Sequence, residues 1–117
     1  MEPDATGTSS LREEALARAL AAAHDTLAAK IALLETEQAA GNLAPGQAAE
    51  QARAAQVVYE RDCGLARVAA ETGWRTWVGV GGVLYARRER TSPPKVVRAA
   101  TAEELAAKIR EHEAARS

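Results

Sequence analysis

Phenylalanine is absent from this sequence, and aromatic residues of any kind are few: two tryptophans and two tyrosines among 117 residues. Alanine supplies much of the 47% hydrophobic content, so the core that one chain can bury is thin for its length. The length corresponds to one domain. A thin core of this kind gains stability from contacts with a partner.

Cysteine and long apolar runs are also scarce. The single cysteine, Cys63, excludes a disulfide within the chain, and no cationic stretch ahead of an apolar segment marks a secretory signal. No apolar run approaches the roughly 18 residues of a membrane-spanning helix. One cysteine and two distant histidines cannot complete a zinc shell. These absences predict a soluble protein of the reducing cytoplasm, without membrane contact, metal or cofactor.

Charge is distributed unevenly along the chain, although the net charge is only -1. Residues 1–73 carry eleven acidic side chains against six basic ones, whereas residues 74–98 carry six basic side chains against Glu89 alone. The six are Arg75, Arg87, Arg88, Arg90, Lys95 and Arg98. The middle of the chain is therefore a basic island in an otherwise acidic protein.

The first two thirds of the chain predict a helical hairpin. Residues 1–9 mix proline, glycine and polar residues without an apolar period, and we expect a disordered tail there. Ser10 and Glu13 form a capping box that opens the first helix. Glycine, asparagine and proline in residues 40–47 then predict a tight turn into a second helix. Two long helices joined by so short a turn fold back antiparallel over residues 10–73.

The apolar stripes of the two helices predict how they face each other. In an antiparallel hairpin, the numbers of two facing residues have a nearly constant sum. A sum of about 86 places large residues of the first helix opposite mostly small residues of the second. The stripes are Leu20, Leu27, Ile31 and Leu34, and Ala48, Ala52, Ala55, Tyr59, Asp62, Ala66 and Ala69. This register sets His24 opposite Asp62, a polar layer that would fix register or partner choice. An acid–base pair with Cys63 as nucleophile is the alternative, but adjacent helix positions diverge by about 100°.

From Trp74 onward the period changes to that of extended strands, joined by a Gly-Val-Gly-Gly stretch. A dinucleotide fingerprint needs a third glycine where Leu84 stands and a helix after the loop, whereas a strand follows here. The glycines therefore predict a hairpin turn rather than a phosphate loop. Alternation places Trp77 on one face with Arg75 and Arg88, opposite Val78 and Tyr85.

The end of the chain completes an α+β fold. Pro93 and Pro94 interrupt the ladder, and residues 95–99 predict a third strand. Thr101 and Glu104 form a second capping box, which opens a helix with an inner face of Leu105, Ala106 and Ile109. The predicted order is ααβββα: an antiparallel helical hairpin, then a three-stranded antiparallel sheet and a C-terminal helix over residues 74–117, packed as one domain. Val57, Val58, Leu65 and Val68 lie off the hairpin seam, and we expect them to dock the sheet.

The sequence indicates a binding role rather than catalysis, because no acid, base and nucleophile converge. We expect a non-enzymatic interaction or accessory module whose helices 10–73 associate with a partner, most simply a second copy. The alternative is a small nucleic-acid-binding or regulatory protein whose basic sheet surface neutralises phosphates while Trp77 stacks on bases. That surface comprises Arg75, Trp77, Arg87, Arg88, Arg90, Lys95 and Arg98. These arginines could instead keep an edge strand soluble, some of them paired with the acidic helices.

The segment GWRTWVGVGGVLYARRERTSPPKVVRAATAEELAAKI, residues 73–109, resembles short uncharacterised proteins of high-GC actinobacteria. They share a tryptophan-containing strand, a glycine turn and a strand that ends in Tyr-Ala-Arg-Arg. A valine-rich strand then leads into an Ala-Glu-Glu-Leu helix. The resemblance covers about a third of the chain and implies no activity.

Overall fold

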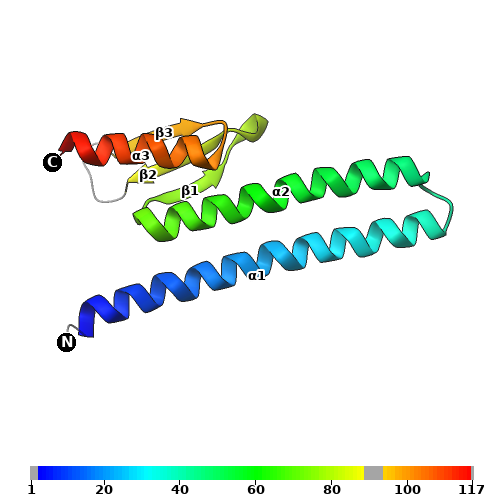
Figure 1. Cartoon of the computed structure of the whole chain (residues 1–117), viewed down its shortest axis with the longest axis horizontal. Helices are drawn as coiled ribbons and strands as arrows, with labels where there is room; N and C mark the ends of the chain where they lie inside the picture. Colours follow the sequence, from blue (N-terminus) through cyan, green and yellow to red (C-terminus); the bar gives the residue numbers. More distant parts are fainter. Residues whose placement is uncertain (1–2, 89–93, 117) are drawn as a thin grey trace.

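The computed structural model describes residues 3–88 and 94–116 and has the predicted ααβββα order. The elements are α1 (Pro3–Ala39), α2 (Pro45–Thr72), β1 (Arg75–Val78), a single 3-10 turn η1 (Val80–Gly82), β2 (Leu84–Arg88), β3 (Lys95–Ala99) and α3 (Ala102–Arg116). The two long helices lie side by side, and the sheet with α3 sits beside the C-terminal half of α2 (Figure 1). The molecule is therefore elongated, measuring 58 × 33 × 19 Å.

The first helix begins earlier than the sequence predicted. α1 starts at Pro3, so it includes residues of the expected tail, and Ser10 lies inside the helix rather than at its N-terminus. Proline is tolerated in the first turn, where its missing N–H needs no partner. Once a helix has formed, each added residue gains a hydrogen bond at little further cost. Helix propagation thus overrides the local capping signal at Ser10.

Both ends of α2 are capped by hydrogen bonds. Gln47 Oε1 accepts a hydrogen bond of 3.0 Å from the Ala44 N–H at the N-terminus. At the C-terminus Gly73 has a left-handed φ of 77°, and its N–H donates to Ala69 O. The Arg12 guanidinium lies over this cap, since a Cβ added at Gly73 would come within 2.9 Å of Arg12 Nη2. A cation from α1 thereby stands at the negative end of the α2 dipole.

The predicted hairpin seam is confirmed on α2, where all seven residues of the stripe are buried or half-buried. On α1 the inward residues are Leu16, Leu20, Ala23, Leu27, Ile31 and Leu34. Leu34 lines one groove together with Ala48 and Ala52, in agreement with the predicted register. Small alanines opposite leucines allow the helix backbones to approach closely.

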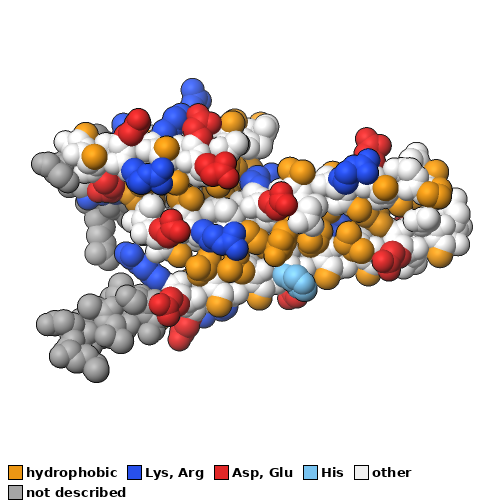
Figure 2. Space-filling view, in the orientation of Figure 1, with side chains coloured by type: hydrophobic (Ala, Val, Ile, Leu, Met, Phe, Trp, Pro, Cys, Tyr) orange, Lys and Arg blue, Asp and Glu red, His pale blue; other side chains and the backbone are white. Residues whose placement is uncertain are grey.

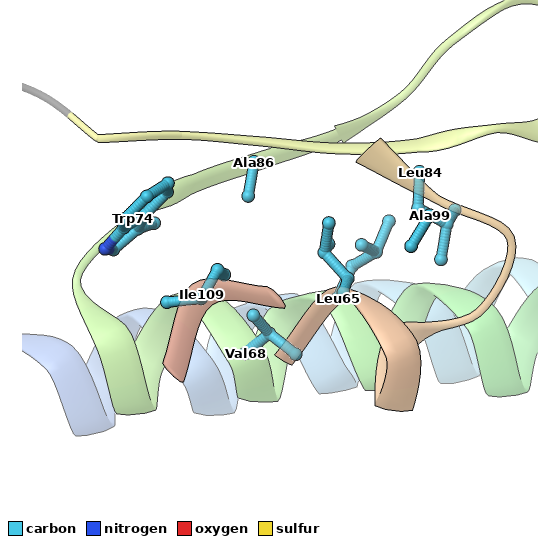
Figure 3. Close-up of a cluster of buried hydrophobic side chains, with 8 residues drawn as sticks. Leu65, Val68, Trp74, Leu84, Ala86, Ala99 and Ile109 are labelled. Carbon is cyan, nitrogen blue, oxygen red and sulfur yellow. The ribbon is translucent and has the colours of Figure 1, made fainter. Parts of the chain in front are cut away.

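The core lies between one face of the sheet and the helices α2 and α3 (Figure 3). It consists of Leu65, Val68, Trp74, Leu84, Ala86, Ala99, Leu105 and Ile109. Leu65 and Val68 thus dock the sheet as predicted. Val57 and Val58 do not, since they remain 64% and 39% exposed, and that part of the prediction was wrong. The sheet is too short to reach the part of α2 on which they lie.

The glycine stretch forms the predicted hairpin turn between β1 and β2. The Gly82 N–H donates to Gly79 O, and Gly81 has a φ of 75°, the positive value that a type II turn requires at its third residue. Val78 pairs with Leu84, so Trp77 pairs with Tyr85. The expectation that Tyr85 lies on the opposite face from Trp77 was therefore wrong. Cross-strand register depends on how many residues the turn takes up, which alternation along each strand does not reveal.

Candidate functional surfaces

The sheet has an outer face, which points away from the core. Cross-strand pairing lays its residues out in two rows, with Arg75, Arg87 and Val96 in one and Trp77, Tyr85 and Arg98 in the other. We call these six residues the outer sheet face. They alternate with the core residues along each strand, and Trp77 and Val96 are 37% and 47% exposed. The structure therefore presents an open surface that combines aromatic rings with cations.

Two aromatic side chains stack at the centre of this face. The rings of Trp77 and Tyr85 have centroids 5.4 Å apart and planes inclined by 8°. The Tyr85 ring lies against Gly79, where an added Cβ would overlap Cε2 and lie 3.0 Å from Cδ2. Gly79 is thus required for ring packing and not for an unusual backbone conformation. Sequence reasoning missed Tyr85, although its place directly across the glycine turn from Trp77 was a usable signal.

Three of the predicted basic residues gather on this face without acidic partners. Arg75, Arg87 and Arg98 form no ion pair with any residue that the structure describes. Arg87 Nε is buried and has no hydrogen-bond partner among those residues. Arg75, Trp77 and Arg87 together line a shallow depression of about 330 Å³. The positive charge of this patch is consequently not neutralised within the described fold.

The remaining predicted basic residues do not join them. Arg88 alternates onto the side of the sheet that α3 covers, where its Nε lies 3.8 Å from Glu113 Oε1. Glu113 also accepts a hydrogen bond of 2.9 Å from Trp74 Nε1. Lys95 pairs with Arg88 in the ladder and therefore shares that side. Arg90 lies outside the described residues. Arg88 thus has an acidic partner, but that partner lies on α3 and not on the acidic helical hairpin that the sequence suggested.

His24 and Asp62 do not form the predicted polar layer. The His24 side chain is 70% exposed, with Nδ1 3.9 Å from Asp25 Oδ1, and Asp62 pairs instead with Arg61 at 3.3 Å. Ala23 occupies the inward position. A seam with a period near 3.5 residues can place either Ala23 or His24 at this inward position. Alanine is favoured there because burying an imidazole would cost its desolvation. The prediction was wrong, and its catalytic alternative loses its base.

Cys63 is buried in α2, one helical turn beyond Tyr59. Its thiol, through a hydrogen bond and then through charge, raises the pKa of the Tyr59 phenol above its ordinary value. Arg67 opposes the shift. Tyr59 therefore stays neutral at physiological pH. His24 is exposed beside Asp25, and His112 packs against Trp74, so the contacts of both histidines lie away from this thiol.

A second surface lies on the helical hairpin, toward its loop. The α2 stripe that buries Leu65 and Val68 under the sheet continues toward the loop as Ala54 and Val58, where neither the sheet nor α3 reaches. The groove there has a volume of about 380 Å³ and is lined by Thr26, Lys30, Gln51, Ala54, Ala55 and Val58. Hydrophobic side chains also follow the junction of α1 and α2 in Figure 2. We call this surface the distal groove.

Among the described residues, no three histidine, cysteine, aspartate or glutamate side chains lie close enough together to hold a metal ion. In the same part of the chain, no helix combines the length and hydrophobicity needed to cross a bilayer. Comparisons of the chain with protein-family models, with curated proteins and with solved structures find no match.

Proposed function

We propose that the protein is a non-enzymatic interaction module that self-associates through its helical hairpin. The observation that carries this proposal is the continuity of one α2 stripe. Its C-terminal half, at Leu65 and Val68, is buried under the sheet, whereas its loop-proximal half, at Ala54 and Val58, is uncovered. Two helices alone leave such a stripe in water, and further helices packed on them bury it.

A second copy of the chain fits this groove. Lys30 is the one charged residue among the six that line it, and its long side chain can keep the ammonium in water while the stem lies on apolar surface. The small side chains of Ala54 and Ala55 allow another helix to approach closely. In a two-fold pair each copy brings the same groove to the other, so the two hairpins form a four-helix arrangement.

The proposed module is not an enzyme, because the side chains that could act together in catalysis lie apart. His24 points to solvent beside Asp25, while Asp62 pairs with Arg61. Cys63 is buried, and the second histidine, His112, packs against Trp74 with ring centroids 5.5 Å apart. Nucleophilic catalysis needs a base within hydrogen-bond reach of the nucleophile. A single buried thiol also suits a reducing cytoplasm, where we place the protein.

Sedimentation equilibrium at micromolar concentration tests the self-association. We expect the mass of two chains for the wild type and of one chain for Val58→Asp, because the new carboxylate would be buried in the interface. Val57→Asp is the matched control: Val57 is the preceding residue of the same helix, is more exposed at 64%, and does not line the groove. Circular dichroism should show equal helix content in all three proteins.

Two results would overturn the proposal. One is a wild-type protein that sediments as a single chain over the whole micromolar range. The other is an equal loss of the dimer in Val57→Asp and Val58→Asp, which would place the interface elsewhere on α2. A monomer that captures a different protein through Val58 would keep the groove as an interface but would refute the second copy as its occupant.

A further inference from the structure

We infer that the outer sheet face is a binding site for single-stranded nucleic acid, in which a base stacks on Trp77 and arginines hold the phosphates. The inference is independent of the hairpin interface, since the two surfaces share no residue. It rests on three features of the described residues: a fixed aromatic platform, a depression beside it, and three cations without acidic partners.

The Trp77 indole is stacked on Tyr85 and also borders the depression. Tyr85 stacks on one face of the Trp77 indole, with ring centroids 5.4 Å apart. The depression of about 330 Å³ is lined by Trp77, Arg75 and Arg87 and not by Tyr85, so it adjoins the indole in a place that the stacked tyrosine does not fill. A flat base entering there would extend the stack to three rings. Because Tyr85 packs against Gly79 and stacks on the indole, little side-chain entropy remains to be lost on binding.

The charges are placed to meet a chain of phosphates rather than a single anion. Arg75 and Arg87 face each other across β1 and β2, and Arg98 lies on β3 beside Tyr85. Neighbouring strands are about 4.8 Å apart, so the three cations span a width of roughly 10 Å. None of them forms an ion pair with a described residue. A polyanion laid across the strands would meet each in turn and release counterions at each contact.

Single strands fit this geometry better than duplexes do. In a duplex the bases stack on one another and present only their edges, so Trp77 would have no ring to stack on. Exposed aromatic rings beside cations are the features by which proteins bind unpaired bases. Tryptophan, tyrosine and arginine are also common at the centres of protein interfaces. Within the outer sheet face three cations surround the rings and Val96 is the one aliphatic residue, which favours a polyanion.

Fluorescence anisotropy tests the inference with the full chain and labelled oligothymidylate or oligouridylate of about 12 nucleotides. Titrations between about 20 and 200 mM salt should show binding that weakens steeply with salt. A duplex of equal length should bind more weakly. Emission of Trp77 should be quenched by the single strand, while Trp74, which is 3% exposed, should contribute a constant background. Quenching reports stacking directly and would not change if the phosphates alone were bound.

Substitutions assign the site. Trp77→Ala should weaken single-strand binding about 5- to 150-fold and abolish the quenching, and Trp77→Phe, which keeps a ring, should retain part of the affinity. Arg75→Gln should lower the salt slope by about 0.7, the value of one phosphate contact on a single strand. Arg53→Gln removes the same charge from an exposed position on α2 and should change neither quantity.

Three outcomes would overturn the inference. The first is flat anisotropy at the lowest salt, which would leave the outer sheet face to a protein partner. The second is equal affinity for duplex and single strand with unchanged Trp77 emission, which would mean that binding is electrostatic and without stacking. The third is an equal effect of Arg53→Gln and Arg75→Gln, because the arginines of the sheet would then have no special role.

Discussion

Gly79 and Gly81 stand two residues apart in the hairpin turn, yet the structure requires glycine at the two positions for different reasons. Gly79 has an ordinary extended backbone, with a φ of -96° and a ψ of -170°, but the Tyr85 ring lies against it. Gly81 has a φ of 75° and nothing within 4 Å of the position that a Cβ would take. Alanine at the first position should disturb a side chain, and alanine at the second should strain the backbone.

The magnitudes follow from these two situations. Gly79→Ala displaces Tyr85 from Trp77, which removes an aromatic pair worth about 0.5–1.5 kcal/mol. Alanine also restricts the unfolded chain, which returns about 0.4–1 kcal/mol, so the free energy of unfolding should fall by no more than about 1 kcal/mol. Gly81→Ala forces a left-handed conformation on alanine and should lower the free energy of unfolding by about 1–2 kcal/mol.

Urea unfolding and near-ultraviolet circular dichroism separate the two effects. We expect Gly79→Ala to change the near-ultraviolet signal of the stacked rings with little loss of stability, and Gly81→Ala to do the opposite. In a Tyr85→Ala background, Gly79→Ala should become neutral or stabilising, because the ring that it displaces is gone. The reasoning fails if Gly79→Ala is equally costly with and without Tyr85, or if Gly81→Ala leaves stability unchanged.

Three further predictions concern the core and the helices, each checked by chemical unfolding. Leu105, fully buried in α3, should cost about 2–5 kcal/mol when replaced by alanine, and a loss below about 1 kcal/mol would contradict its place in the core. Gly64→Ala gains about 1 kcal/mol of helix propensity, but its Cβ would lie 2.8 Å from that of Ala102. Overpacking costs about 1–3 kcal/mol, so we expect a net loss, and a more stable variant would refute the close approach of α2 to α3. His24→Ala should change stability by less than about 0.5 kcal/mol, since the imidazole is exposed, whereas a large loss would revive the polar layer.

The proposed surfaces differ in how far the sequence anticipated them. The distal groove exists because the apolar stripe of α2 continues beyond the part of the helix that the sheet covers. The sequence instead predicted that Val58 packs against the sheet. The number of residues that the sheet covers is a property of the packed layers and is not encoded in the period of α2. For the outer sheet face the sequence identified Trp77 with Arg75, Arg87 and Arg98 and omitted Tyr85. The side chains that share a face were decided by the cross-strand register.

The order of the elements, the seam of α2 and the glycine turn were determined by the sequence, because each depends on contacts within a few residues: helical and strand periods, the turn at residues 40–47, and positive φ at Gly81. Tertiary structure alone decided the rest. The pairing of Val78 with Leu84 brought Tyr85 onto Trp77, and the packing of α3 brought Glu113 to Arg88 and Trp74. The contact of Arg88 with Glu113 joins residues far apart in the chain. Local sequence patterns do not determine which face of a strand a distant helix will cover.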